Sequence, residues 1–230
     1  MTAQSGRLGV GIIGAGKVGP VLGAALAGAG HAIVGIAAVS ERNLERAQAL
    51  LDVPVLEIPQ LIERSELVIL AIPEKEIEQL VAGLAATGAW QPGQIVMHTA
   101  PGLGFLALGA ATAAGAIPLA VHPAMAFTGT SMDLVRLRES YCAVTAPTPV
   151  LPIGQALVVE MGAEPIIIAE VDRPAYAEAI ATATSFSAAI VGQAVGLLSG
   201  IGIEHPGAVL GPLVRASVEN ALQAAAADRL

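Results

Sequence analysis

Three glycines near the start of the chain, Gly14, Gly16 and Gly19, have the spacing G-x-G-x-x-G. In this pattern the first glycine permits a tight turn, the second lets the backbone approach a pyrophosphate, and the third allows close helix–strand packing. Backbone N–H groups at the start of the following helix then face the anion. The pattern predicts dinucleotide binding, and the alternative is a turn that serves packing alone. The predicted cofactor loop is Gly14-Ala15-Gly16-Lys17-Val18-Gly19.

The residues after the second predicted strand, Ser40, Glu41 and Arg42, bear on which dinucleotide is bound. In NAD enzymes an acidic side chain at this place pairs with a ribose hydroxyl, and in NADP enzymes a nearby arginine accepts the extra phosphate. Ser40 and Arg42 can both bond a 2′-phosphate, whereas Glu41 would have to turn inward to serve NAD. NADP is therefore predicted over NAD. The alternative is that Ser40 is an ordinary helix cap and Arg42 a solvated side chain.

Two histidines stand at the ends of predicted strands, where a doubly wound sheet binds its ligands. Ile72, Pro73 and Thr99 occupy similar strand ends and are predicted to contact the cofactor. Hydride transfer to a carbonyl or imine carbon needs a group that donates or accepts a proton at the heteroatom, and histidine does this near neutral pH. His122 is the first candidate catalytic residue and His98 the second. The alternative for each is a structural histidine with satisfied hydrogen bonds.

The elements that must position these residues alternate between strand and helix over residues 7–169. Near-continuous apolar runs such as 67–70 are typical of central parallel strands covered on both faces. The prediction is an α/β fold with a doubly wound, Rossmann-type parallel sheet. The expected strands are 7–13, 32–39, 53–56, 66–72, 94–98, 116–121, 141–145 and 165–169. The expected helices are 17–29, 42–51, 59–64, 74–86, one between 98 and 116, and one ending near 161.

Strand signals stop near residue 170, and two helices are expected at 173–198 and 206–227. We therefore predict a Rossmann dinucleotide-binding domain over 1–170 and a small all-α domain over 171–230. A helical piece of this size buries little core of its own, which favours a homodimer through the C-terminal helices. The charge-free stretch 179–203 is long enough to span a bilayer, but its serines, threonines and glutamine favour a helix of a soluble protein.

Composition excludes several partners. Charged residues make up 13% of the chain and hydrophobic residues 54%, against about 25% charged in an ordinary soluble domain. The net charge is −8 and the chain has two lysines, so neither nucleic acid nor an anionic membrane surface is an expected partner.

Cys142 is the only cysteine, so no intrachain disulfide can form. Its place in an apolar strand predicts a small buried side chain. The four histidines are too scattered to show metal-ligand spacing, and no metal is predicted. The first six residues lack the pattern of a signal peptide, which together with the lone cysteine predicts a cytoplasmic protein.

Several motifs together carry a family resemblance. They are G-A-G-K-V-G at 14–19, A-I-P-E at 71–74, H-T-A-P-G at 98–102, H-P-A-M-A-F at 122–127 and D-R-P-A-Y at 172–176. The chain resembles uncharacterised Rossmann-like oxidoreductases with a helical C-terminal domain of unknown function. Its cofactor domain is similar to those of pyrroline-5-carboxylate reductase and the deazaflavin-dependent NADP reductases, which implies NADP and a helical dimer interface.

The H-P element also resembles the corresponding motif of prephenate dehydrogenases, in which the histidine contacts the substrate hydroxyl whose carbon gives up hydride. The resemblance implies that role for His122. The chain departs from these relatives after His98, where Thr-Ala-Pro-Gly replaces a serine-rich turn, and its C-terminal helices are short. The resulting hypothesis is an NADP-dependent oxidoreductase that transfers hydride between a nicotinamide and a C=O or C=N bond of a small metabolite. The alternative is a non-catalytic NADP-binding regulatory or interaction module.

Overall fold

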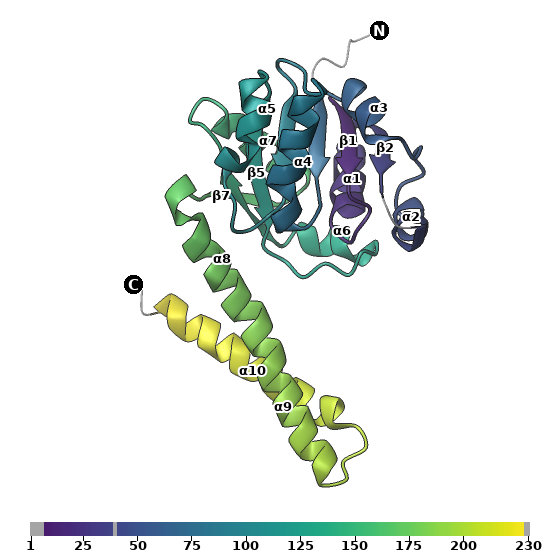
Figure 1. Cartoon of the computed structure of the whole chain (residues 1–230). Coiled ribbons are helices and arrows are strands. Elements are labelled where there is room, and N and C mark those ends of the chain that lie inside the picture. The colour runs from purple at the N-terminus through teal and green to yellow at the C-terminus, as the bar shows by residue number, and fades with distance from the viewer. Residues whose placement is uncertain (1–6, 39–40, 228–230) are drawn as a thin grey trace. The chain divides into compact units, whose positions relative to one another are not determined.

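The computed structural model of the chain describes residues 7–38 and 41–227, without the side chains of Glu41, Arg42 and Arg46. Its centre is a seven-stranded sheet of order β2-β1-β3-β4-β5-β6-β7 (Figure 1). The strands are β1 (Gly9–Ile13), β2 (Ala32–Ala37), β3 (Leu67–Leu70), β4 (Ile95–His98), β5 (Ile117–Pro123), β6 (Tyr141–Thr145) and β7 (Glu164–Ile167). The predicted α/β fold with a doubly wound sheet is confirmed.

Strand direction changes once across the sheet. Strands β1 to β5 are parallel, β6 pairs antiparallel with β5, and β7 runs parallel to β6. The order reverses between β1 and β3, which makes the crevice outside their carboxyl ends the topological switch point where such folds bind ligands. The glycine loop follows β1 and therefore lies at this switch point.

Helices cover both faces of the sheet, as Figure 1 shows. The helices are α1 (Gly19–Gly28), α2 (Glu41–Gln48), α3 (Ile58–Glu63), α4 (Glu74–Ala86), η1 (Phe105–Leu108), α5 (Gly109–Ala113), α6 (Met132–Leu137) and α7 (Leu151–Glu160). On one face, apolar residues of β1, β3 and β4 pack with α1 and α7 around Ile12, Leu22 and Leu157. On the other face, alternate residues of β3 and β4 pack with α3, α4 and α5 around Leu61 and Ile77.

Most elements predicted from the sequence are observed, and the main differences are three. The sheet was predicted as parallel, whereas β6 runs antiparallel to β5. The segment 53–56, predicted as a strand, contributes a single bridge between Val55 and Ile36. Helix α6 was not predicted, and it is anchored by the fully buried Asp133, whose carboxylate accepts bonds from the N–H groups of Thr128 and Gly129 at 2.8 and 2.7 Å. These bonds hold the pKa of Asp133 below its ordinary value, against the opposing effect of burial.

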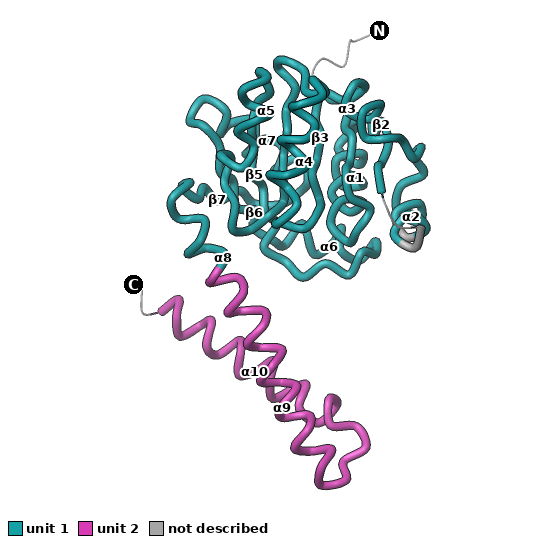
Figure 2. Tube along the Cα trace, viewed as in Figure 1, with its two compact units in different colours: residues 1–177 teal, residues 178–230 magenta. Residues whose placement is uncertain are grey.

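The chain divides into two compact units, residues 1–177 and 178–230, coloured separately in Figure 2. The boundary that the sequence predicts near residue 170 precedes this division. Within the second unit, α9 (Ser187–Gly200) contacts α10 (Pro206–Ala227), and no residue of either helix is buried. The preceding η2 (Glu170–Asp172), α8 (Arg173–Ala181) and η3 (Thr182–Phe186) join with α9 into a helix over Glu170–Gly200 that is long and apolar enough to cross a membrane.

Candidate functional site

The first glycine of the loop has a backbone that other residues rarely adopt. Gly14 has φ +113°, and its N–H donates to the carbonyl of Ala37 at 2.9 Å. A β-carbon on Gly14 would overlap the carbonyl oxygen of Ala71, the residue that follows β3. The loop therefore crosses the end of β3 at backbone-to-backbone distance, which only glycine permits.

The other two glycines have different surroundings. A β-carbon on Gly19 would overlap the Gly14 carbonyl oxygen and lie 2.9 Å from Cγ2 of Ile12, so Gly19 is required for α1 to pack on β1. A β-carbon on Gly16 would meet no atom within 4 Å. Packing thus accounts for Gly14 and Gly19 but not for Gly16, and the space beside Gly16 is what a pyrophosphate needs.

Helix α1 begins directly after this space. Val18 is its N-cap residue, and no side chain of the described residues caps it. The first backbone bond of the helix joins the N–H of Leu22 to the carbonyl of Val18 at 3.1 Å. Because Pro20 has no N–H, the groups of the first turn that are available to an anion are the N–H groups of Gly19 and Val21. Ala15 is buried and Lys17 is exposed, which adds one positive charge at the loop.

Sheet register places the other predicted residues at the same edge. Ile13 is level with Leu70, Leu70 with His98, and His98 with Ala120. The residues after each of these positions therefore lie side by side at the carboxyl edge. Ile72 and Thr99 are half-buried there, and Pro73 caps α4. Ser40 lies outside the described residues, and so does the side chain of Arg42.

His98 is fully buried, and backbone groups bond both of its ring nitrogens. The N–H of Ala100 donates to Nδ1 at 3.2 Å, and Nε2 lies 2.8 Å from the carbonyl oxygen of Gly104. The first bond requires an unprotonated Nδ1, so Nε2 carries the proton and donates to Gly104. Burial and then the charge of Arg173 lower the pKa of His98 to about 4, although the Gly104 bond opposes them. This geometry fixes the turn after β4.

His122 is half-buried near the end of β5 and contacts one side chain. Its Nδ1 lies 2.8 Å from the hydroxyl of Tyr176, with the two rings edge to face at a centroid distance of 5.6 Å. Within the described residues, Nε2 of His122 has no hydrogen-bond partner. Every buried side-chain nitrogen of these residues has a partner, so Nε2 is not buried and is open to solvent. Burial, followed by the charge of Arg173, lowers the pKa of His122 to about 4.

Arg173 is a buried cation that binds neutral oxygens at the carboxyl edge. Its Nε donates to Oγ1 of Thr145 at 2.7 Å, and Nη2 donates to the carbonyls of Ala120 and Ala143 at 3.1 Å each. Nη1 lies 3.5 and 3.4 Å from the carbonyls of Ala100 and Pro101. The guanidinium carbon lies 5.8 Å from the centroid of the Tyr176 ring. Burial lowers the pKa of Arg173 to about 10, so the group is charged at neutral pH.

Two carboxylates hold the segment between β4 and η1. Glu170 accepts hydrogen bonds from the N–H groups of Phe105 and Leu106 at 2.9 and 3.2 Å, and Glu74 accepts one from Gly102 at 3.1 Å. Together with the His98 and Arg173 bonds, these contacts tie A-I-P-E, H-T-A-P-G and D-R-P-A-Y into one assembly at the carboxyl edge. Arg173 and Tyr176 were not predicted as site residues from the sequence, although the D-R-P-A-Y motif contains both.

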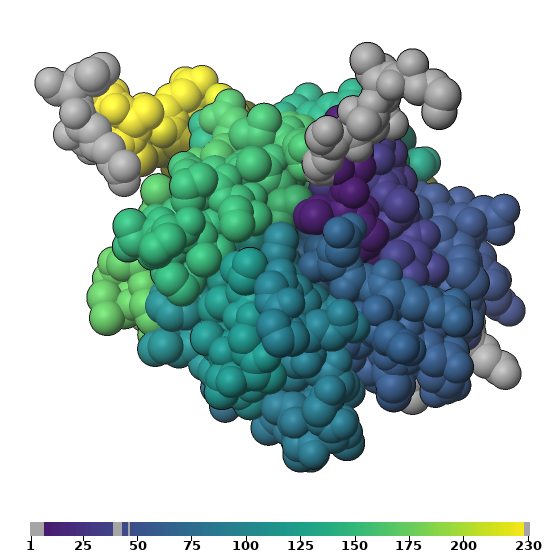
Figure 3. Space-filling model, turned by 90° about the horizontal axis from the view of Figure 1, so that it is seen from above, coloured from purple at the N-terminus to yellow at the C-terminus, as the bar shows by residue number. Residues whose placement is uncertain are grey.

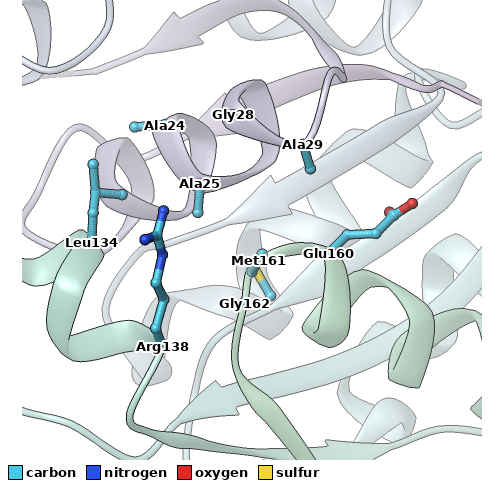
Figure 4. A pocket seen from close by; sticks show the side chains of 9 residues that line it. All are labelled: Ala24, Ala25, Gly28, Ala29, Leu134, Arg138, Glu160, Met161 and Gly162. Atoms are coloured by element: carbon cyan, nitrogen blue, oxygen red, sulfur yellow. The ribbon is translucent and has the colours of Figure 1, made fainter.

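Two hollows on the first unit lie away from this edge. One has a volume of about 280 Å³ and is lined by α1, by Leu134 and Arg138 around α6, and by Glu160 and Met161 around the end of α7 (Figure 4). Another lies at the opposite, amino edge of β3 and β4, between Glu66 and Gln94. Figure 3 views the amino edge, where the first described residues (purple) lie beside the blue segments that follow. Neither hollow includes a residue of the glycine loop.

The remaining chemical groups have simple environments. Cys142 is buried on β6 as predicted, and burial raises the pKa of its thiol to about 12, which makes it a poor nucleophile at neutral pH. Within 7–38 and 41–227, no cluster of three or more histidine, cysteine or carboxylate side chains has the geometry of a metal site.

The sheet order, the glycine turn at the switch point and the open helix N-terminus define a Rossmann-type α/β protein. Residues 2–123 match the family model of the Rossmann-like domain, and residues 140–230 match that of the domain of unknown function DUF2520. The chain therefore belongs to the family of the Rossmann-like domain, and its C-terminal part matches DUF2520. A comparison with curated protein sequences finds no match.

Solved structures from several organisms share the fold at low sequence identity, among them the following three. A candidate NADP oxidoreductase from Bacteroides fragilis is 17% identical at a TM-score of 0.75, over 93% of this chain and 80% of that one. A 1-pyrroline-5-carboxylate reductase from Streptococcus pyogenes is 20% identical at a TM-score of 0.68, over 93% and 79%. An imine reductase variant from Myxococcus stipitatus in complex with NAD+ is 18% identical at a TM-score of 0.63, over 98% and 79%.

Proposed function

We propose that the protein is an NADP-dependent oxidoreductase that transfers hydride between a nicotinamide and a C=O or C=N bond of a small metabolite. The observation that carries the proposal is the juxtaposition of two features at one edge of the sheet. The first is the glycine loop, with open space beside Gly16 and the free N-terminus of α1. The second is His122, whose Nε2 is open to solvent. The solved structures that share this fold include one named as a candidate NADP oxidoreductase and an imine reductase in complex with NAD+.

The residues around Gly16 fit a dinucleotide. A pyrophosphate beside Gly16 would receive bonds from the first N–H groups of α1, with Gly14 and Gly19 keeping the backbone close. When bound, the nicotinamide supplies or accepts the hydride. NADP is favoured over NAD because Ser40 and Arg42 follow β2, where the 2′-phosphate is read in such folds.

The chain's own contribution to the reaction is at the heteroatom of the substrate. His122 is the proposed catalytic residue, with Nε2 facing the substrate. Its lowered pKa keeps the imidazole neutral at pH 7, a state that can donate a hydrogen bond without carrying charge. His98 keeps the adjoining turn in place, since the backbone already uses both of its nitrogens.

Consumption of NADPH with a panel of aldehydes, ketones, 2-oxo acids and cyclic imines tests the proposal. We expect turnover with at least one compound, and a loss of about 100-fold or more in His122→Gln. His205→Gln, at an exposed histidine of the second unit, serves as the control. Equal turnover in His122→Gln and the wild type would refute the catalytic assignment. NADPH binding without turnover on any compound would favour the regulatory module.

A homodimer through the C-terminal helices is part of the proposal. Large apolar side chains on α9 and α10 are exposed, among them Ile190, Leu197, Val209, Leu213 and Leu222, each at 59% or more. A second copy of the same helices would bury them, and such burial stabilises by about 25 cal/mol per Å². Sedimentation at micromolar concentration tests this, and a monomer there would contradict it.

We also infer a cytoplasmic location. The lone cysteine is buried on a strand, which suits a reducing compartment. Burial of the apolar helices in a dimer would leave no face for a bilayer. Cell fractionation tests the inference, and recovery of the protein with membranes would contradict it.

A further inference from the structure

We propose that Tyr176 positions His122 and supplies the proton that the imidazole ring of His122 passes on to the substrate. The group that is reduced is a carbonyl. The proposal rests on the proposed function and adds a proton source and a substrate class to it. It starts from the 2.8 Å contact between the Tyr176 hydroxyl and Nδ1 of His122, which no part of the cofactor site explains.

The chemistry of the two groups favours one direction for their hydrogen bond, which depends on the tautomer of His122. An imidazole nitrogen accepts hydrogen bonds well, and a phenolic hydroxyl is a good donor but a weak acceptor. Tyr176 therefore donates to Nδ1 of a neutral His122. The ring proton is then on Nε2, the nitrogen that is open to solvent. In histidine sites the hydrogen bond made by one ring nitrogen decides whether the other ring nitrogen carries the proton.

A neutral histidine can deliver a proton only if it regains one at once. The imidazolium form of His122 is scarce at neutral pH because burial and Arg173 both oppose it. As hydride reaches the carbonyl carbon, negative charge develops on the oxygen. The Nε2–H bond breaks while the new O–H bond forms, and the Tyr176 O–H bond breaks while an Nδ1–H bond forms. The products are the alcohol, a neutral His122 and a Tyr176 phenolate, which water reprotonates.

Arg173 provides the charge that makes this path favourable. Its guanidinium lies 5.8 Å from the centre of the Tyr176 ring, and it stabilises the phenolate. The pKa of Tyr176 is raised by burial and lowered by Arg173, with a net rise, so the hydroxyl is protonated in the resting state. Cys142 on β6 also acts on Tyr176 and raises its pKa. The carboxylates of Glu170 and Glu74 and the ring of His98 face Arg173, and the two carboxylates offset part of its charge.

The positive charge of Arg173 also favours a carbonyl substrate over an iminium ion. A carbonyl becomes negative as it accepts hydride, and both Arg173 and the Nε2–H group favour that change. An iminium ion arrives with a positive charge, which the buried Arg173 would repel. It also needs no proton during reduction. The site therefore fits aldehydes or ketones.

Nitrogen NMR of the full chain labelled with ¹⁵N-histidine tests the resting state directly, without a substrate. His122→Gln assigns the signal. We expect His122 at neutral pH to be protonated on Nε2 and unprotonated on Nδ1, and we expect Tyr176→Phe to raise the share protonated on Nδ1. Tyr141→Phe, which changes the other tyrosine of the chain at an exposed position, should leave the spectrum unchanged. Wild-type His122 protonated on Nδ1, or an unchanged His122 signal in folded Tyr176→Phe, would overturn the proposal.

A second measurement covers the case in which Tyr176→Phe does not fold. Incorporation of 3-fluorotyrosine makes the phenol a stronger donor, and the Nδ1 signal of His122 should shift while that of His98 stays in place. No shift at His122 would overturn the proposal.

Kinetics separate this proposal from the proposed function. Tyr176→Phe should lower kcat on a carbonyl substrate about tenfold or more, with NADPH affinity unchanged. If NADPH binds but only imines are reduced, the carbonyl assignment is wrong while the oxidoreductase stands. If no dinucleotide binds, the proposed function fails and the proton path fails with it.

Discussion

The carbonyl oxygen of Ala71 occupies the place where a side chain on Gly14 would have to lie. This contact joins the turn after β1 to the end of β3 at the switch point of the sheet. A β-carbon on Gly16, two residues further along the chain, would have no atom within 4 Å. The glycine pattern thus combines two residues needed by the fold with one, Gly16, that packing does not require.

Substitution of the two glycines by alanine should separate these roles. Gly14→Ala forces a residue with a side chain to φ +113° and against a backbone oxygen, and it should lower the free energy of unfolding by about 2 kcal/mol or more. Gly16→Ala should stay within about 0.5 kcal/mol of the wild type. Urea denaturation of both variants measures the difference. Equal stability of the two would contradict the packing described for Gly14.

Loss of the buried guanidinium should be costly. Arg173→Met leaves the carbonyls of Ala120 and Ala143 and the Thr145 hydroxyl without their donor, and we expect a loss of about 3 kcal/mol or more. Arg138→Met, at an exposed arginine, is the matched control and should change little. If both variants unfold at the same urea concentration, Arg173 does not hold the carboxyl edge together.

Stability should fall as the pH drops from about 6.5 to about 4. His98 and His122 have pKa values near 4 in the folded chain, against an ordinary value of 6.5, so the unfolded chain binds more protons between these limits. Their contribution is complete above pH 6.5 and is lost as the pH falls to 4. Unfolding midpoints measured across this range should have a smaller slope in His122→Gln than in the wild type. His205→Gln should keep the full slope, and a flat wild-type profile would contradict the assignment.

A charge on the second unit should break the proposed dimer. Val209 on α10 and Val159 on α7 are exposed to nearly the same extent, at 59% and 61%. Val209→Glu should shift the sedimenting species from dimer to monomer, because a buried unpaired charge opposes association. Val159→Glu should remain a dimer. Dissociation in both variants, or in neither, would place the interface elsewhere.

Local sequence signals were sufficient for most of the first unit. Helix α4 was predicted with the bounds observed, because Pro73 stops the preceding strand and apolar residues recur at helical spacing. The glycine loop was found because its spacing fell between a strand and a helix. Helix α6 was missed because its six residues are too few to show a period, and the bonds that anchor it join Asp133 to the backbone of the preceding turn.

Local sequence signals could not predict the direction of β6 or the residues that surround His122. A short apolar run fits either strand direction, and the choice depends on how residues 124–140 return to the sheet. Tyr176 lies 54 positions from His122 in the sequence, so no local pattern joins them. The D-R-P-A-Y motif marked the segment as specific, but only the fold shows that Arg173 and Tyr176 reach the carboxyl edge.

Thermal unfolding with and without NADP, NADPH, NAD and NADH tests the central claim, that the glycine loop binds a nicotinamide dinucleotide. A ligand at about 100 times its dissociation constant adds roughly 2.7 kcal/mol of stability. We predict stabilisation by NADP and NADPH, a smaller effect of NAD and NADH, and loss of the effect in Gly16→Ala, where a methyl group would fill the pyrophosphate space. No stabilisation of the wild type by any of the four, or the same stabilisation in Gly16→Ala, would contradict the claim.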